Sequence, residues 1–430
     1  MNTFREFIEK IRSENRMAVA SKEISKNLDL AGLMHVLDGK PVYAPKVEGS
    51  DFPAVGNVFS TRDLICEYFG IEKEELIPKL IEAMERPTKP ELVQDGPVLE
   101  NNTSEIDLSK LPIPIHAEKD GGPYLASAIV IAKDKEYGRN LSFHRMMVID
   151  KDKVVMRILH RNLEEFIKRA GGELDVAVIV GAPINVLLSA AISSRIGQDE
   201  LEYANTLAKV NTVKLSNGIE IPADCEFAFE GRITKEMADE GPFIDLTETY
   251  DVVRKQQVMK FTRMYHRNNA VWHVLLPGGL EHKVLMGMPR EPTIFTEVNK
   301  VCQCKAVNIT PGGCCWLHAA VSIKKKNEND GKAAIEAAFA GHKSLKHVVI
   351  VDDDIDVDNP AEVEWAIATR FQADKDLIVK EKQKGSSLDP SADPHTYETT
   401  KMGMDATKPL DDAKAFEKAG WKRIDPSDYL

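Results

Sequence analysis

Two polar clusters near the middle of the chain combine residue types that bind oxyanions. Gly138 to Arg145 (GRNLSFHR) holds Asn, Ser, His and Arg in one short stretch, and Met156 to Asn162 (MRILHRN) adds two arginines and a histidine. Arg and His donate hydrogen bonds to phosphate and carboxylate oxygens. Together the clusters predict a cationic pocket suited to phosphate oxygens or a flavin. The alternative is a solvated hairpin rim with its usual Arg and His, and spacing alone does not choose.

A third cluster is rich in carboxylates. It comprises QDELEYAN, with Asp199, Glu200 and Glu202, and the stretch EGPFID, in which Glu240 and Asp245 flank a Gly-Pro turn. Burial and a neighbouring like charge raise the pKa of a carboxyl group, so paired acids of this kind can donate protons. Surface acids are common at this composition, so the acids by themselves do not identify a site.

The first two clusters need elements that bring them together. Strand-like runs at Phe143 to Asp150 and Val154 to Leu159 flank a Lys-Asp-Lys turn, which predicts a hairpin. In a hairpin both clusters lie near the same end of a sheet. Ala126 to Lys133 and Val176 to Val180 are further expected strands.

Helices and loops are expected at both ends of the chain. Thr3 and Glu6 form a capping box for a first helix, and Ser60 to Arg86 is expected as one helix that ends before Pro87. Near the C-terminus, the strand Lys346 to Val351 and a helix that starts at Asn359-Pro360 form a strand–helix–strand pattern with the strand Asp376 to Val379, typical of a mixed or parallel sheet. Leu388 to Pro409 is expected to be a loop.

Composition limits the class of protein. The chain has 430 residues with 43% hydrophobic and 29% charged residues, which is typical of a globular protein of two or three domains. Its net charge of −12 argues against nucleic acid as the main partner. The most apolar stretch, Asp175 to Ile192, is too short to span a bilayer and contains Pro183. The N-terminal segment lacks the apolar core of a secretory signal peptide, so the protein is expected in the cytoplasm. Its six cysteines are therefore expected to be thiols.

Several common motifs are absent from the sequence. It has no GxGxxG after a strand, no GxxxxGK[ST], no GxSxG and no HExxH, which argues against Rossmann dehydrogenases, P-loop enzymes, serine hydrolases and zincins. DDDIDVDN lacks the Gly and the final carboxylate of a calcium loop, so it is interpreted as a solvated acidic loop. The CxC and CC spacings of Cys302, Cys304, Cys314 and Cys315 favour buried thiols over zinc.

A series of blocks gives the chain a family resemblance. In order they are GGPYLASAIVIAKD, GRNLSFHRM, MRILHR, PADCEFAFEG, DEGPFID, ITPGG, VIVDDDIDVDNPAEVEWAIATRFQADKDL, SSLDPS and MGMDAT. In these blocks the chain resembles the UbiD-type decarboxylases, which depend on prenylated FMN. The resemblance runs from about Phe4 to Pro409.

The resemblance implies an α/β protein of three domains. These are an N-terminal α/β domain at 1–115, a central split β-barrel that binds prenylated FMN at 116–300, and a C-terminal α/β oligomerisation domain at 301–430. It also implies a homo-oligomer, a dimer or hexamer, and a flavin prenyltransferase that supplies the cofactor.

Metal and flavin positions follow from the same resemblance. Asn140 matches the metal-binding Asn of the family motif N-x-[SG]-x-x-R, His160 lies where the family has a His near the metal, and Glu200 is the expected acidic ligand, with Glu202 as its rival. They would hold Mn²⁺ or Mg²⁺, with K⁺ as a further ion, against the cofactor phosphate. The positions that match the flavin cradle are Ser142, Phe143, His144, Arg145, Arg157, Ile158, Leu159, Arg161 and Asn162.

Arg145, Glu240 and Asp245 match the catalytic triad of the family. In that scheme the modified flavin adds to an α,β-unsaturated acid, CO₂ leaves, and an acid protonates the carbon. Asp245 is the expected acid, held by Arg145 with Glu240 in support. Ile244 is a departure, because relatives often have Gly there, and it would reshape the pocket beside the acid.

The resemblance is closest to the archaeal branch that decarboxylates trans-anhydromevalonate 5-phosphate to isopentenyl phosphate. A phosphorylated substrate needs cationic groups, and Arg254 to Arg267 (RKQQVMKFTRMYHR) supplies several. The alternative for that run is a solvated basic helix face. Two other functions stay open: an aromatic-acid decarboxylase of the 4-hydroxybenzoate type, and a flavin-binding scaffold without activity.

Overall fold

The computed structural model describes residues 1, 3–416, 418–422 and 424–429. The chain forms two compact units. The first contains Met1–Pro292 with Cys314–Trp316 and Leu388–Pro390, and the second contains Thr293–Gly313, Leu317–Ser387 and Ser391–Leu430. Within the described residues no helix has the length and apolar character needed to cross a membrane.

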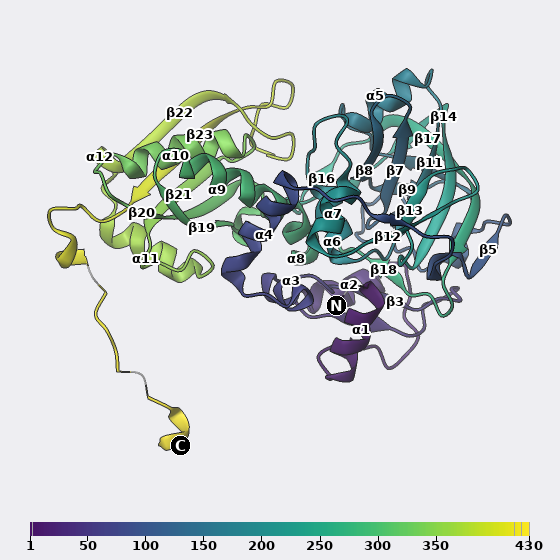
Figure 1. Cartoon of the computed structure of the whole chain (residues 1–430), viewed down its shortest axis with the longest axis horizontal. Coiled ribbons are helices and arrows are strands. Elements are labelled where there is room, and N and C mark those ends of the chain that lie inside the picture. The colour runs from purple at the N-terminus through teal and green to yellow at the C-terminus, as the bar shows by residue number, and fades with distance from the viewer. Residues whose placement is uncertain (2, 417, 423, 430) are drawn as a thin grey trace. The chain divides into compact units, whose positions relative to one another are not determined.

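A nine-stranded sheet is the centre of the first unit (Figure 1). Its order is β6-β9-β10-β17-β14-β11-β7-β8, with β5 paired to β17, and all its strand pairs are antiparallel. The strands are β5 (Asn101–Thr103), β6 (Tyr124–Leu125), β7 (Ile129–Asp134), β8 (Gly138–Phe143), β9 (Met146–Val148), β10 (Lys153–Met156), β11 (Leu174–Val180), β14 (Phe227–Glu240) and β17 (Arg254–His266).

The middle of the sheet is buried on both faces, as β11 shows. Its run VAVIV has no polar residue, as expected for a strand covered on both sides. Side chains alternate between faces along a strand. Ala177 and Ile179 join one apolar core, while Val176 and Val178 join another. The sheet therefore separates two cores and is held firmly from both sides.

The other elements of the first unit are helices and small sheets. The strands pair as β1-β2-β3-β18, β13-β12-β4 and β15-β16. The helices are α1 (Phe4–Ser13), α2 (Asp29–Val36), α3 (Arg62–Phe69), α4 (Lys73–Glu85), α5 (Asn162–Arg169), α6 (Ile184–Ala191), α7 (Glu200–Leu207) and α8 (Leu280–Gly287). The strands are β1 (Ala18–Val19), β2 (Val42–Ala44), β3 (Ala54–Gly56), β4 (Glu91–Leu92), β12 (Asn211–Lys214), β13 (Glu220–Pro222), β15 (Phe243–Ile244), β16 (Tyr250–Asp251) and β18 (Trp272–Val274).

The second unit is a mixed sheet with helices (Figure 1). Its order is β19-β20-β21-β23-β22, and β20, β21 and β23 run parallel. The strands are β19 (Gln303–Ile309), β20 (His318–Lys324), β21 (His347–Asp352), β22 (Leu377–Lys384) and β23 (Glu398–Ala406). The helices are α9 (Glu291–Asn299), which begins in the first unit, α10 (Asp330–Gly341), α11 (Pro360–Arg370) and α12 (Ala373–Asp376).

Several expected elements are confirmed. Thr3 and Glu6 form the capping box of α1, and the Asn359 side chain caps α11. β9 and β10 form the expected hairpin, with Val155 opposite Met147. The mixed sheet expected near the C-terminus is also present.

Three expectations about local structure are wrong. Ser60 to Arg86 is two helices, because Gly70 takes the left-handed conformation that ends α3, and the N-cap is Thr61. Leu388 to Pro409 contains β23, which pairs with β21 on one side and β22 on the other. Arg254 to Arg267 is strand β17 almost throughout, so its basic residues alternate between two faces and form no helix face.

Candidate active site

Asn140 and Glu200 form a buried pair beside β8. The Asn140 amide Nδ2 donates to Glu200 Oε1 at 2.9 Å, and the backbone N–H of Leu141 donates to Oε2 at 2.8 Å. Glu200 is the first residue of α7, after the N-cap Asp199. Burial raises the pKa of Glu200 to about 8. A buried carboxylate beside an amide is a donor set that fits a hard divalent cation.

The two rival acids differ in position. Glu200 is 1% exposed, whereas Glu202 is only partly buried. His160 does not join the pair: its side chain is 92% exposed, and Nδ1 contacts Glu164 Oε1 at 2.6 Å. Within the described part of the chain, no group of three or more His, Cys, Asp or Glu side chains is arranged to hold a metal. The structure therefore brings together Asn140 and Glu200 but leaves His160 at the surface.

His144 links the two polar clusters of the hairpin. Its Nδ1 donates to the backbone carbonyl of Arg157 at 2.8 Å, so Nε2 accepts from the Ser142 hydroxyl at 3.0 Å. Burial lowers the pKa of His144 to about 4, so the ring is neutral. The backbone N–H of Arg157 donates in turn to the carbonyl of Arg145 at 3.1 Å. These contacts fix the second cluster beside the first.

The remaining cradle positions lie at the end of β8, in the stretch after β10 and at the start of α5. Arg161 donates to the Ser193 hydroxyl at 2.9 Å, and Asn162 donates to the Ser194 carbonyl at 3.2 Å. Phe143 and Ile158 are partly buried against the two cores, while Leu159 is exposed. The cradle thus combines guanidinium and amide donors with an apolar surface, which fits a flavin with its phosphate.

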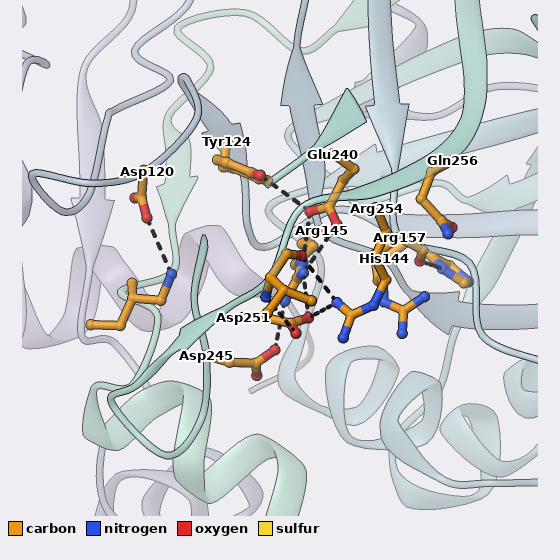
Figure 2. A network of polar contacts seen from close by, with 12 residues as sticks. Asp120, Tyr124, His144, Arg145, Arg157, Glu240, Asp245, Asp251, Arg254 and Gln256 are labelled. Atoms are coloured by element: carbon orange, nitrogen blue, oxygen red, sulfur yellow. Dashed lines mark hydrogen bonds and ion pairs between the residues drawn. The ribbon is translucent and has the colours of Figure 1, made fainter. Parts of the chain in front are cut away.

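Arg145 lies among three carboxylates (Figure 2). Its Nε and Nη2 donate to the two oxygens of Glu240 at 2.9 and 3.0 Å. Nη1 donates to Asp245 Oδ2 at 2.6 Å, and Nη2 also donates to Asp251 Oδ2 at 2.8 Å. The predicted trio of Arg145, Glu240 and Asp245 is therefore one hydrogen-bonded network, to which the structure adds Asp251.

The network is largely desolvated. Glu240 has no exposed surface, and the Tyr124 hydroxyl donates to its Oε1 at 3.1 Å. Burial disfavours the charge of Arg145, but its hydrogen bonds to Glu240 and the charges of Asp245 and Asp251 outweigh burial and raise its pKa. Burial likewise opposes the charge of Asp251, yet Arg254 and Arg145 lower its pKa below the ordinary value. The guanidinium and Asp251 are thus held in their charged forms.

Two glycines let the backbone make this turn. Gly241, which follows β14, has φ of +101°, a conformation that side chains rarely adopt. Gly121 packs against it so closely that a Cβ there would lie 2.3 Å from the Gly241 carbonyl oxygen. The chain then forms the β15–β16 hairpin, in which Phe243 pairs with Asp251. The hairpin carries Asp245 and Asp251 to the same guanidinium.

Three residues of this site, Asp251, Tyr124 and His282, were not expected from sequence, and Arg254 was expected only as a member of the basic run Arg254 to Arg267. Asp251 and Arg254 arrive through strand register, because Arg254 pairs with Glu240. Tyr124 comes from β6, and His282 from α8. Burial lowers the pKa of His282 although the charge of Asp245 opposes this, and Gly278 N donates to its Nδ1 at 3.1 Å. The alternation of β17 beside the acid turn is the signal that could have singled out Arg254 within that run.

Most basic residues of the Arg254 to Arg267 run point elsewhere. Lys255 pairs with Asp239, Lys260 pairs with Asp152, Arg263 donates to Asn102, and Arg267 lies near Glu226. Arg254 alone among them contacts the network, through Asp251 at 2.6 Å. The run is thus not one phosphate-binding surface.

Comparisons with known proteins agree with this geometry. The N-terminal, Rift-related and C-terminal domains of the family described as 3-octaprenyl-4-hydroxybenzoate carboxy-lyase match residues 8–84, 91–280 and 283–406. The chain belongs to the UbiD family. A similar curated protein is the anhydromevalonate phosphate decarboxylase of Methanocaldococcus jannaschii, 44% identical over 90% of this chain and 92% of the relative. The protein of that name from Methanothermobacter thermautotrophicus is 42% identical over 96% and 99%.

Solved structures support the same family assignment. The UbiD-class enzyme HmfF from Pelotomaculum thermopropionicum in complex with FMN has a TM-score of 0.96 at 36% identity, with 100% of both chains covered. An evolved dimeric form of HmfF in complex with prFMN has a TM-score of 0.92 at 34% identity, again over 100% of both chains. The expected mixed α/β fold is therefore confirmed.

The choice between the two rival acids can be tested by metal content. We predict that Glu200→Gln abolishes Mn²⁺ retention, because it removes the buried carboxylate beside Asn140. Glu202→Gln, the matched control, should retain the metal. Elemental analysis of both proteins purified in the presence of Mn²⁺ measures this, and the opposite pattern would assign the metal to Glu202.

The neutral state of His144 predicts a dependence of stability on pH. Its folded pKa of about 4 lies below the ordinary 6.5, so the unfolded chain takes up the proton first as pH falls. Its contribution to stability is complete above pH 6.5 and is lost on acidification toward pH 4, by about 1.4 kcal/mol per pH unit at most. Urea unfolding at pH 7, 6 and 5 should show a flatter dependence for His144→Gln than for wild type. The exposed control His395→Gln should behave like wild type.

Proposed function

We propose that this chain is a prenylated-FMN-dependent decarboxylase that converts trans-anhydromevalonate 5-phosphate into isopentenyl phosphate and CO₂. The observation that carries this proposal is the set of archaeal relatives named anhydromevalonate phosphate decarboxylase, which are 38–44% identical over 86–97% of the chain. The buried network of Arg145, Glu240 and Asp245 supports it, because it places an acid beside the flavin cradle.

The chain offers residues for each part of the cofactor. Asn140 and Glu200 would hold Mn²⁺, or Mg²⁺, against the phosphate, with K⁺ as a further ion. The cradle from Ser142 to Asn162 would hold the ring system. Prenylated FMN supplies, when bound, the electron sink that an unsaturated carboxylate needs in order to lose CO₂.

The protein residues orient the reaction and move the proton. Glu240 fixes the Arg145 guanidinium through two hydrogen bonds, and Arg145 fixes Asp245 through one. The bond between the carboxylate group and its neighbouring carbon breaks, and CO₂ leaves. Asp245 then gives its proton to the carbon that had carried the carboxylate. The product gains that hydrogen, and Asp245 recovers a proton from solvent before the next turnover.

Partners and location complete the proposal. A flavin prenyltransferase would supply the cofactor, and the chain would act as a homo-oligomer in the cytoplasm, with domains at 1–115, 116–300 and 301–430. The similarity to HmfF, of which an evolved dimeric form is known, supports assembly from identical chains. The acidic net charge of −12 speaks against nucleic acid as a partner.

The experiment that tests the proposal is a product assay. The protein is co-expressed with a flavin prenyltransferase and offered trans-anhydromevalonate 5-phosphate and, separately, 4-hydroxybenzoate. We expect isopentenyl phosphate and CO₂ from the first and no phenol from the second. Phenol alone would move the enzyme to aromatic acids, and no CO₂ from either acid despite bound prenylated flavin would favour a non-catalytic flavoprotein.

The role of Asp245 generates a further prediction. Asp245→Asn cannot donate the proton, so turnover should fall by about 100-fold or more. The flavin should remain bound, as measured by its absorbance. The control Asp239→Asn removes an exposed acid that pairs with Lys255 and should keep full activity. Wild-type activity in the Asp245 variant would show that another group protonates the carbon.

A further inference from the structure

Two arginines flank the Arg145 network without belonging to the family triad. Arg254 begins β17, and its backbone lies opposite Glu240 in the sheet register. Arg157 follows β10, and its N–H donates to the Arg145 carbonyl at 3.1 Å. Figure 2 shows the guanidinium groups of Arg157 and Arg254 next to each other beside Asp251. The two side chains therefore approach one edge of the site from different segments, the loop after β10 and the start of β17.

The charges of these arginines are compensated unequally. Arg145 has Glu240, Asp245 and Asp251 as partners. Arg254 shares Asp251 through Nη1 alone, which also donates to the Val252 carbonyl at 3.2 Å. Among the described residues, no protein acceptor takes a hydrogen bond from Nε or Nη2 of Arg254.

Arg157 has even less compensation. No carboxylate of the described residues forms an ion pair with its guanidinium, which is partly buried. Burial and the neighbouring charge of Arg254 lower its pKa. The charges of Asp251 and Glu240 act on Arg157 in the opposite sense but do not outweigh burial and the arginines. Since a guanidinium stays protonated in proteins, the result is a positive charge that no carboxylate pairs with directly. An anionic ligand placed between Arg157 and Arg254 would relieve that repulsion.

We propose that Arg157 and Arg254 form the subsite for the phosphate group of the substrate. This inference rests on the proposed function, in which the substrate carries a carboxylate at one end and a phosphate at the other. A guanidinium group binds phosphate oxygens through paired N–H donors, and two guanidinium groups match the charge of a phosphate dianion. Asp251 contacts both Arg254 and Arg145, so it ties the phosphate subsite to the residues that handle the carboxylate.

The same chemistry could serve the phosphate of the flavin, because the resemblance places Arg157 in the flavin cradle. The location of Arg254 favours the phosphate of the substrate over that of the flavin. Arg254 adjoins the acids of the catalytic network, whereas the donor set that fits the cofactor phosphate and its metal is Asn140 with Glu200. Measuring flavin retention and substrate recognition on the same variants distinguishes binding of the flavin phosphate from binding of the substrate phosphate.

The test compares Arg254→Gln and Arg157→Gln with the control Lys255→Gln. Lys255 is the next residue on β17, but it is exposed and pairs with Asp239. Each holoenzyme is assayed with trans-anhydromevalonate 5-phosphate and with the same acid lacking the phosphate. For the phosphorylated acid we expect kcat/KM to fall about 100-fold in both arginine variants, mainly through KM. For the acid without phosphate the loss should be much smaller than for the phosphorylated acid, and the Lys255 variant should match wild type with both acids.

A binding measurement gives a readout that does not depend on turnover. Calorimetric titration of isopentenyl phosphate into the holoenzyme should show tight binding to wild type and to Lys255→Gln, and weak binding to the two arginine variants. Arg254→Lys should give an intermediate affinity, because an ammonium group keeps the charge but loses the paired donors. The Arg254→Lys variant also keeps the test informative if Arg254→Gln does not fold.

The outcomes distinguish the inference from the function on which it rests. If wild type converts the phosphorylated acid but the arginine variants affect both acids equally, the phosphate subsite is wrong and the function stands. Loss of bound flavin in these variants, with the remaining holoenzyme unchanged toward both acids, would assign the arginines to the cofactor phosphate. If wild type neither converts the phosphorylated acid nor binds isopentenyl phosphate, the proposed function and the inference both fail.

Discussion

The rest of the site depends on the buried ion pair between Arg145 and Glu240. Glu240 has no exposed surface, and such a pair is tolerable only when hydrogen bonds satisfy both groups. Two N–H groups of Arg145 and the hydroxyl of Tyr124 meet this condition. Loss of one partner would strand a buried charge at a cost of about 3–5 kcal/mol. The fold therefore cannot lose the guanidinium without losing stability, and this fixes the position from which Arg145 holds Asp245 and Asp251.

The backbone of one short stretch sets the spacing between the two polar centres. Asn140 and Arg145 are five residues apart, so their Cα atoms are separated by at most about 17 Å. His144 lies between them and joins Ser142 to the Arg157 carbonyl, so it ties the stretch to the neighbouring loop. Because its pKa is lowered by burial, His144 stays neutral and keeps one tautomer at neutral pH. A ligand with a phosphate at one end and a ring at the other thus meets a rigid frame.

Local sequence signals predicted part of this molecule well. The cap of α1, the hairpin of β9 and β10 and the start of α11 depend on neighbouring residues, and all are confirmed. β23 was missed because its pairing with β21 and β22 is a tertiary contact that its polar sequence does not reveal. In the site, resemblance predicted the Asn140–Glu200 pair and the trio of Arg145, Glu240 and Asp245, which the structure brings together, but also His160, which lies at the surface. Asp251 was missed because it reaches Arg145 only through the β15–β16 register.

The geometry also separates the roles of the two acids that were predicted together. A guanidinium has five N–H groups, and Arg145 uses four of them on Glu240, Asp245 and Asp251. Both oxygens of Glu240 accept from Arg145, and the residue has no exposed surface, so it cannot meet a ligand. Asp245 accepts only one N–H from Arg145, and its side chain is 20% exposed. Each of its oxygens has a second lone pair, so Asp245 can carry a proton without giving up its contacts with Arg145 and Leu246. Of these two acids, Asp245 is therefore the one that we propose as the proton donor to a bound substrate.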